Sequence, residues 1–174
     1  VYGVKTGFTN GANRCLVTSC KRNDMDIICV VLGAVTKNFR TQDSIKLIEY
    51  AFKTYTYVNI ENMINEFFDE WINNHQNTFF IEKGVEQNIN LKLSSISTPI
   101  IPIKNTDINN IEIIPDINTY FIAPVIENSK VGNLNILLNN EVILHCDVLC
   151  ENYIAKKNVG NYLLDFFKDY LSIF

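Results

Sequence analysis

A short motif near the start of the chain, Lys5-Thr6-Gly7, has the residue types needed to bind an anionic, peptide-like ligand. The Lys5 ammonium supplies positive potential, and the Thr6 hydroxyl can donate a hydrogen bond to a carboxylate. Gly7 lets a ligand backbone lie against the strand, because a β-carbon would obstruct it. Such a triplet also arises by chance as a strand end with a polar cap, so its interpretation depends on the surrounding sequence.

We expect Arg40 on the short loop that follows the apolar run ending at Leu32-Gly33. A guanidinium fork can bind a carboxylate through two parallel hydrogen bonds, which a lysine cannot reproduce. The alternative is a solvated loop arginine that caps the next helix. The sequence leaves both interpretations open.

A complete serine-type nucleophilic site is absent from the 174 residues. Ser-x-x-Lys, which pairs a serine nucleophile with a lysine base, does not occur, and neither does Ser-x-Asn. The nearest string is Thr18-Ser19-Cys20-Lys21, which begins with threonine. The sequence therefore offers groups that could bind a ligand without a nucleophile to attack it.

Metal and cofactor chemistry find no support in the five cysteines and two histidines. There is no Cys-x-x-Cys pair, and no histidine lies at ligand spacing from a cysteine. Cys15 and Cys29 lie inside apolar runs, where cysteine usually acts as a small buried hydrophobe. We expect no metal site and no cofactor.

Three strands are predicted to position the motif. Cys15 to Lys21 and Asp26 to Ala34 are β-rich runs joined by the polar turn Arg22-Asn23-Asp24, which predicts an antiparallel hairpin. Val1 to Phe8, which contains the motif, is predicted to be the strand that precedes them.

Helices are predicted after these strands. The first spans Thr41 to Tyr57, with Thr41 and Asp43 as candidate caps and with apolar residues at helical spacing. These apolar residues are Ile45, Ile48, Ala51, Phe52 and Tyr55. A second helical pattern over residues 60–71 is a candidate connector. Three strands and one helix leave a sheet face uncovered, so residues 1–57 are not expected to fold alone.

Between Thr78 and Cys150 the pattern changes to short β-like runs separated by polar, proline or glycine breaks, which predicts a small all-β module. The runs cover residues 79–81, 89–93, 100–103, 111–114, 120–123, 131–138 and 142–149. Asn139-Asn140 between the last two runs predicts a hairpin turn in which both asparagines adopt positive φ.

The final segment, residues 159–174, is predicted to be a strongly amphipathic helix. Its apolar face contains Val159, Tyr162, Leu163, Phe166, Phe167, Tyr170, Leu171 and Phe174. It carries two aspartates and one lysine, so we expect attachment to a membrane surface through apolar burial rather than through charge. The alternative is that this face packs on the β-rich module or on a partner.

Charge is distributed unevenly along the chain, whose formal net charge is −4. Residues 1–57 carry eight Lys and Arg against four Asp and Glu, whereas the remainder is acidic. The excess of Lys and Arg in residues 1–57 suits an anionic substrate better than a nucleic acid, for which a stronger basic stripe interleaved with aromatic residues would be expected. We expect no nucleic-acid partner.

The context of the motif resembles a known enzyme family. Val4-Lys5-Thr6-Gly7-Phe8-Thr9 leads into the two apolar runs 15–22 and 27–33. This string is similar to the third active-site element of low-molecular-mass penicillin-binding proteins, in particular the serine-type D-alanyl-D-alanine carboxypeptidases of the S11 family from sporulating bacteria. The resemblance covers nearly the whole chain, including Val131-Gly132 and the terminal helix.

The resemblance implies an α+β fold and an acyl-serine enzyme that removes the terminal D-Ala of peptidoglycan stem peptides and is inhibited by β-lactams. Lys5, Thr6 and Gly7 would be catalytic. Thr6, the backbone N–H of Phe8 and the Arg40 guanidinium would bind substrate, with the Phe8 amide in the oxyanion hole. The serine nucleophile and the Ser-x-Asn motif would lie upstream of Val1, so this chain alone is expected to be inactive.

Four segments and a location follow from the same resemblance. Residues 1–57 would form the C-terminal part of the transpeptidase-like catalytic domain and complete its sheet. A helical connector (58–77) would link this part to a β-rich domain (78–151), and a membrane-associating helix (152–174) would follow. The protein would act at the extracytoplasmic face of the bacterial cell membrane. Two alternatives remain, a non-catalytic binding module of the cell envelope and a β-lactamase, although β-lactamases normally end soon after the helix that follows this hairpin.

Overall fold

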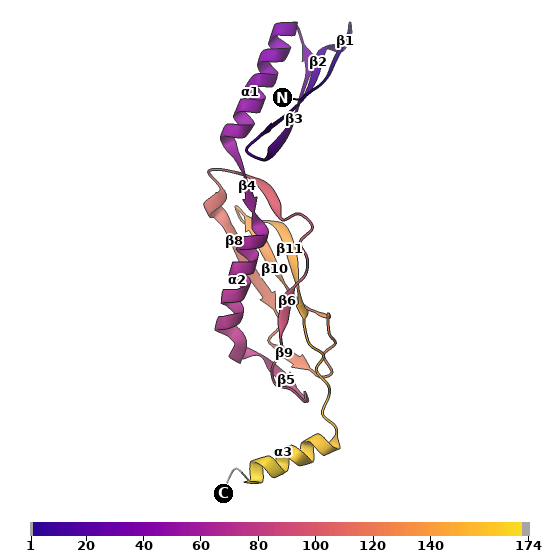
Figure 1. Ribbon diagram of the computed structural model, residues 1–174, viewed down its shortest axis with the longest axis vertical. Coiled ribbons are helices and arrows are strands. Elements are labelled where there is room, and N and C mark those ends of the chain that lie inside the picture. The colour runs from indigo at the N-terminus through magenta and orange to yellow at the C-terminus, as the bar shows by residue number, and fades with distance from the viewer. Residues whose placement is uncertain (1, 172–174) are drawn as a thin grey trace. The chain divides into compact units, whose positions relative to one another are not determined.

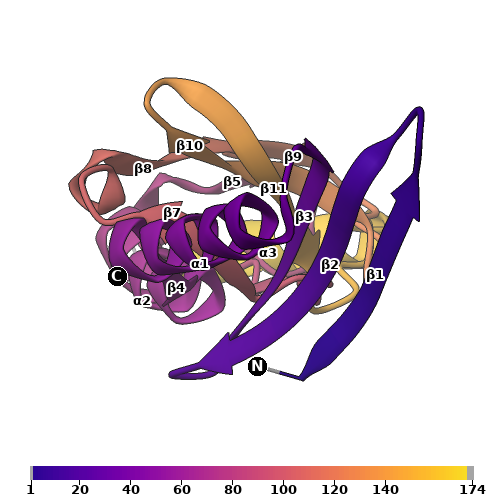
Figure 2. The same ribbon diagram turned by 90° about the horizontal axis from the view of Figure 1, so that it is seen from above.

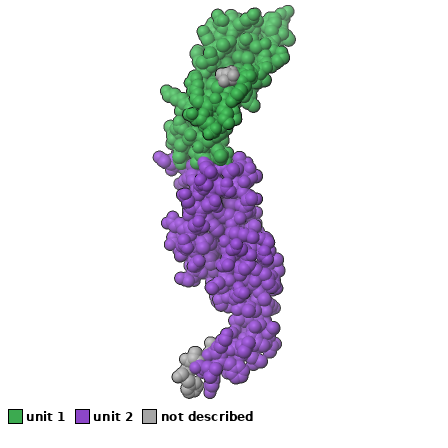
Figure 3. Space-filling model, in the orientation of Figure 1, with its two compact units in different colours: residues 1–58, 100–108 green, residues 59–99, 109–174 purple. Residues whose placement is uncertain are grey.

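The chain divides into two compact units in the computed structural model, which describes residues 2–171. The first unit comprises residues 1–58 and 100–108, and the second comprises residues 59–99 and 109–174 (Figure 3). Both units combine helices with strands, in agreement with the predicted α+β class.

The first unit is built on a three-stranded antiparallel sheet in the order β1-β2-β3 (Figure 2). The strands are β1 (Gly3–Thr9), β2 (Asn13–Arg22) and β3 (Met25–Ala34). Asn23 and Asp24 form the tight turn between β2 and β3, both with positive φ, so the predicted hairpin is confirmed. Asparagine and aspartate tolerate this left-handed conformation better than most residues.

Helix α1 (Lys37–Thr54) covers one face of this sheet, but it begins four residues earlier than predicted. Thr36 is the N-cap, and its hydroxyl accepts a hydrogen bond from the Phe39 amide at 3.1 Å. Thr41 is therefore not a cap; its hydroxyl instead donates back to the Lys37 carbonyl. The core between helix and sheet contains Cys20, Cys29, Val31 and Ile48, with Ala34 and Phe52 packed against it.

Residues 55–57, which were predicted to end the helix, instead belong to a strand. β4 (Tyr55–Asn59) pairs with β7 (Ile100–Lys104) in a two-stranded sheet. The Asn105 amide group donates to the Lys53 carbonyl at 2.9 Å, which satisfies one of the last carbonyls of α1. Residues 100–108, which lie within the predicted β-rich segment, thus belong to the first unit.

The second unit contains one long helix, two sheets and a terminal helix (Figure 1). A four-stranded sheet has the order β6-β11-β10-β8, and a two-stranded parallel sheet joins β5 and β9. The elements are α2 (Ile60–His75), β5 (Phe80–Glu82), β6 (Leu91–Leu93), β8 (Ile111–Ile117), β9 (Tyr120–Ile122), β10 (Lys130–Leu138), β11 (Glu141–Cys150) and α3 (Val159–Leu171), with short 3-10 turns at Gln76–Thr78 and Ile108–Asn110.

The core of this unit follows the expected periodicities. Ile60, Ile64 and Phe68, spaced by four residues, are buried on one face of α2. Alternate residues of β10 and β11 are also buried: Leu134, Ile136, Cys146, Val148 and Cys150. Burial raises the pKa of the Cys146 and Cys150 thiols, so both act as packing groups rather than as nucleophiles. Asn139 and Asn140 both have positive φ, as the predicted hairpin requires.

Gly132 allows β10 to approach β8 closely, and its replacement is expected to destabilise the second unit. A β-carbon at this position would lie 2.4 Å from the Asp116 carbonyl oxygen and 2.6 Å from the Ile117 α-carbon. Both obstacles are backbone atoms, so Gly132→Ala should lower the free energy of unfolding by about 1–3 kcal/mol. Chemical denaturation would measure this. Gly11→Ala is the matched control, since a β-carbon there meets nothing within 4 Å; equal stability of the two variants would contradict the packing argument.

Helix α3 exposes its apolar side chains. Val159, Phe166 and Leu171 retain 77%, 64% and 71% of their accessible surface. The helix start is fixed by Asn158 and Asn161, since each side-chain oxygen accepts a hydrogen bond from the other's backbone amide. Within residues 2–171, none of the helices combines the length and apolarity needed to cross a bilayer. Phe174 of the predicted apolar face lies outside the described residues.

Candidate functional site

The Lys5-Thr6-Gly7 motif lies in the middle of β1, which is an edge strand among the described residues. All side chains of β1 are exposed. The Lys5 ammonium donates a hydrogen bond to the Thr6 carbonyl at 3.2 Å, and within residues 2–171 no partner engages the Thr6 hydroxyl. The motif thus presents one cation and one free hydroxyl along an open strand edge, the groups expected for a carboxylate ligand.

The strand register decides which face of the sheet each motif residue occupies. Thr6 is opposite Leu16 on β2, and Leu16 is opposite Val31 on β3. Paired residues of an antiparallel sheet share a face, and Val31 packs against α1. The Thr6 side chain therefore lies on the α1 face of the sheet. Lys5, opposite Val17, lies on the other face.

Arg40 lies in the first turn of α1, not on the loop where the sequence placed it. The cause is the Thr36 cap, which starts the helix before Arg40; the Arg40 amide accordingly donates to the Thr36 carbonyl at 3.2 Å. Arg40 precedes buried Ser44 and Ile48 by four and eight residues. Residues at this spacing share one face of a helix, so Arg40 lies on the side of α1 that faces the sheet.

A buried hydroxyl pair fixes the level of Arg40 along the sheet. The Thr18 and Ser44 hydroxyls are 3.1 Å apart and hydrogen-bonded, and both residues are almost fully buried. α1 follows β3 through a two-residue link and runs back along it, hence parallel to β2. Arg40 comes one helical turn before Ser44, which is about 6 Å along the helix axis, and Leu16 comes two residues before Thr18, which is about 7 Å along the strand. Because the Thr18–Ser44 contact aligns the two elements, these similar distances bring Arg40 beside Leu16.

Arg40 and Thr6 are thereby brought to the same level on the same face. Arg40 lies level with Leu16, and Thr6 is the next residue across the sheet. The Arg40 Nε is buried and has no hydrogen-bond partner among the described residues. An unpaired buried donor of a charged group is costly, and a carboxylate bound between Arg40 and Thr6 would supply its missing partner.

Gly7 is not required by the packing of this chain. A β-carbon there would lie 3.7 Å from the Cys15 β-carbon, an ordinary van der Waals contact, and Gly7 has no positive φ. The absence of a side chain at this position thus leaves space for a ligand rather than for a neighbouring element. Phe8 is opposite Arg14, whose guanidinium lies 4.7 Å from the centre of the Phe8 ring.

Other chemistry is not assembled in the described part of the chain. Thr18, the first residue of the string nearest to Ser-x-x-Lys, is buried and bonded to Ser44, so it is not available as a nucleophile. Residues 2–171 contain no group of three or more His, Cys, Asp or Glu side chains that could hold a metal. Ser44 was not predicted from the sequence as a positioning residue; its signal is a serine within the stripe of α1 residues that face the sheet.

Comparison with known proteins identifies relatives of the chain. Residues 1–36 match the family model described as D-alanyl-D-alanine carboxypeptidase. The chain is 26% identical to D-alanyl-D-alanine carboxypeptidase DacF of Bacillus subtilis over 163 residues, which are 94% of this chain and 39% of the relative. It is 47% identical to DacC of Escherichia coli over 53 residues, which are 30% of this chain and 13% of the relative.

Solved structures show a similar fold. The D-alanyl-D-alanine carboxypeptidase DacD of Francisella tularensis matches with a TM-score of 0.57 and 24% identity, over 88% of this chain and 36% of that protein. Penicillin-binding protein 5 of Haemophilus influenzae matches with a TM-score of 0.55 and 20% identity, over 88% and 42%. The resemblance drawn from the motif is confirmed. The chain spans about two fifths of the length of the curated relatives that it matches along most of its length.

Proposed function

We propose that this chain, a relative of the D-alanyl-D-alanine carboxypeptidases, forms one side of a peptidoglycan carboxypeptidase active site. This carboxylate wall, formed by Thr6 and Arg40, binds the carboxylate of the substrate. The observation that carries this proposal is the placement of Arg40 and Thr6 at one level on one face of the sheet, beside an open strand edge. Two donors with a cation nearby suit the free carboxylate of a peptide ending in D-Ala-D-Ala.

The roles of the motif residues follow from where their groups lie. Thr6 donates its hydroxyl to the carboxylate, and Arg40 pairs with the same group. Lys5, on the other face of the strand, supplies positive potential near the open strand edge. Gly7 keeps the strand edge open, and the Phe8 amide stabilises the developing oxyanion. β-Lactams, which carry a comparable carboxylate, would occupy the same wall as inhibitors.

Arg40→Lys tests the proposal. The substitution keeps the positive charge but removes the planar fork. Losing one charge-assisted hydrogen bond should lower kcat/KM for a D-Ala-D-Ala peptide by about 10- to 100-fold, mainly through KM. The assay is D-Ala release by the complete enzyme that contains this chain.

Arg22→Lys is the matched control for that experiment. Arg22 lies six residues beyond Leu16 on β2 and pairs with Glu49, away from the motif. This variant should retain kcat/KM within about twofold. An equal loss in both variants would show that the effect is structural, and an unchanged kcat/KM for Arg40→Lys would remove Arg40 from the site.

We also propose that α3 attaches the enzyme peripherally to the extracytoplasmic face of the cell membrane. Its large apolar side chains are exposed, and full burial of each would contribute about 1.5–3 kcal/mol. Lys157 pairs with Asp165 at 2.7 Å, so part of the polar side of the helix is held to the preceding segment. The apolar side therefore remains available to a lipid surface.

Vesicle sedimentation tests this attachment. Phe166→Ser combined with Phe167→Ser should lower the partition coefficient onto phosphatidylcholine vesicles at least about tenfold, because both rings leave the interface. Phe80→Ser is the control, since Phe80 is similarly exposed, at 55%, but lies on β5. Equal partitioning of the double variant and the unmodified enzyme would show that α3 packs against protein instead.

A further inference from the structure

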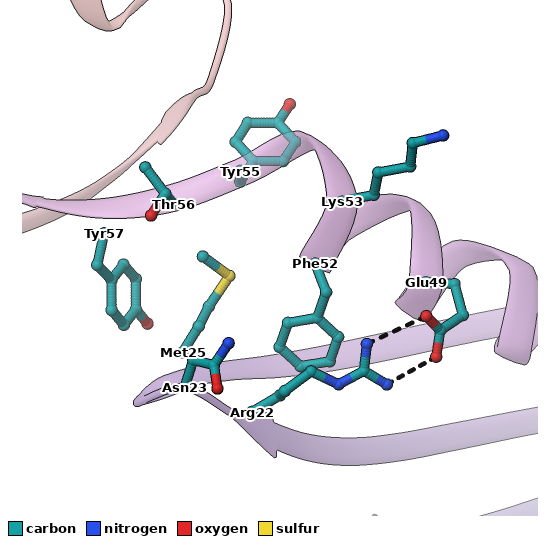
Figure 4. A pocket seen from close by; sticks show the side chains of 9 residues that line it. All are labelled: Arg22, Asn23, Met25, Glu49, Phe52, Lys53, Tyr55, Thr56 and Tyr57. Atoms are coloured by element: carbon teal, nitrogen blue, oxygen red, sulfur yellow. Dashed lines mark hydrogen bonds and ion pairs between the residues drawn. The ribbon is translucent and has the colours of Figure 1, made fainter.

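A cavity in the first unit is separate from the Lys5-Thr6-Gly7 strand. Its volume is about 380 Å³, and it lies between the β2–β3 turn, the last turns of α1 and the start of β4 (Figure 4). Arg22 at its wall is six residues further along β2 than Leu16, which marks the level of Thr6. The proposed carboxylate site accounts for none of the residues that line this cavity.

One wall of the cavity is charged but internally neutralised. The Arg22 guanidinium donates two hydrogen bonds to the Glu49 carboxylate, at 2.7 and 3.1 Å, and lies 4.6 Å from the centre of the Phe52 ring (Figure 4). The hydrogen bonds from Arg22, together with its charge, lower the pKa of the Glu49 carboxyl, which therefore stays ionised at neutral pH. This fixed pair offers planar polar edges and no net charge, which disfavours an anionic ligand.

Neutral hydrogen-bonding groups line the same space. Asn23, Thr56 and Tyr57 all line the cavity, and Figure 4 shows the Asn23 amide and the Tyr57 hydroxyl on the side of the Met25 thioether. Asn23 holds this position because it adopts φ of 49° in the turn. Within residues 2–171, these three polar groups have no hydrogen-bond partners. The Tyr55 hydroxyl, in contrast, points away from the cavity.

We propose that this cavity binds one uncharged, N-acetylated sugar unit of a glycan strand. Its volume is at the low end of the range of about 300–1,000 Å³ found for small-molecule sites, which suits a single ring. The ring hydroxyls and the acetamido group pair with the Asn23, Thr56 and Tyr57 side chains. The apolar ring face and acetyl methyl pack on Met25 and Phe52.

The choice of a sugar over a peptide rests on the charge balance and, in part, on the proposed function. A stem peptide that ends in a free carboxylate needs an unpaired cation, but Arg22 is already paired and the Lys53 side chain points out of the cavity (Figure 4). Peptidoglycan joins its stem peptides to N-acetylated sugars. A sugar site on the same unit would bind the polymer at a second point and raise the effective concentration of its peptides at the carboxylate wall.

The test is a titration of the complete enzyme with tri-N-acetylchitotriose, followed by protein-observed NMR. Thr56→Val and Tyr57→Phe each remove one hydroxyl and keep the shape, so each should weaken binding about 3- to 10-fold. Tyr55→Phe is the matched control and should leave Kd unchanged. Cellotriose, which lacks the acetamido groups, should bind more weakly than the N-acetylated trimer.

Three results would overturn the proposal. They are an absence of saturable binding of the trimer, binding that Thr56→Val and Tyr57→Phe leave unchanged, and preferential binding of an uncharged tripeptide at these residues. The outcome is separable from the carboxypeptidase proposal. Thr6→Val should abolish most D-Ala release from a free peptide while the trimer still binds, whereas Thr56→Val should weaken binding of the trimer while D-Ala release from the free peptide persists. Thermal unfolding of each variant identifies any loss of binding that comes from misfolding.

Discussion

Thr6→Val is expected to reduce D-Ala release by the complete enzyme about 100-fold or more. The substitution removes a hydroxyl donor and keeps the branched shape, on an edge strand where every side chain is exposed. It should therefore leave folding unaffected. The expected loss is the size measured when one preorganised donor is removed from an active site. Steady-state kinetics with a peptide ending in D-Ala-D-Ala provide the measurement.

Thr9→Val is the matched control for this substitution. Thr9 is on the same strand, three residues after Thr6, and its hydroxyl accepts a hydrogen bond from the Ala12 amide within the turn. Its replacement should cost stability rather than turnover. If Thr6→Val keeps full turnover, or if both variants lose it equally, the hydroxyl of Thr6 has no specific part in catalysis.

The 174-residue chain on its own is expected to form no stable adduct with penicillin and to release no D-Ala. Both reactions need an activated nucleophile, and none of its serines has a lysine three residues later. The nearest candidate, Ser19, follows Thr18, which is bonded to Ser44 in the core. The donors of Lys5, Thr6 and the Phe8 amide cannot replace the missing covalent step.

Labelling with a fluorescent penicillin, followed by intact-mass measurement, decides this prediction. We expect no mass increase under conditions in which the complete enzyme is labelled one to one. Ser19→Ala provides a further control, because nonspecific acylation would persist in it. A specific one-to-one adduct on Ser19, or on another residue of this chain, would show that a functional nucleophile lies within it.

Much of the first unit could be predicted from local patterns. The hairpin of β2 and β3 was evident from two apolar runs and the Asn23-Asp24 turn, whose residues tolerate positive φ. The start of α1 could not be placed as well. Thr36 is a good cap, but no Glu or Gln follows at the position that would complete a capping box. The predicted start of the helix therefore followed the apolar residues at helical spacing, which begin later in the sequence.

The end of α1 shows a different limit. Tyr55 fits the helical spacing, but it belongs to β4, which pairs with β7 some 45 residues later in the sequence. The β propensity of Tyr55 to Val58 was a local signal for this strand. The local sequence is compatible with both a helix and a strand here, and only the long-range pairing of β4 with β7 decides between them. A single sequence does not reveal that pairing.

For the candidate site, too, the sequence indicates the residue types but not their arrangement in space. The residue types of Lys5, Thr6, Gly7 and Arg40 indicated carboxylate chemistry without any structure. Their juxtaposition depends on the register of β1 against β2 and on the Thr18–Ser44 contact, which sets the level of α1. Buried hydroxyl pairs of this kind depend on three-dimensional packing, so they leave little trace in the sequence beyond a serine within a mostly apolar stripe.

The most direct test of the carboxylate wall compares two substrates that differ only at that group. The complete enzyme should prefer a D-Ala-D-Ala peptide with a free carboxylate over its C-terminal amide by at least about 100-fold in kcat/KM, because a site built for a charged partner rejects the analogue that lacks it. In Thr6→Val and Arg40→Lys the preference should shrink to about tenfold or less. A preference that persists at full size in both variants would contradict the account, since another part of the enzyme would then bind the carboxylate.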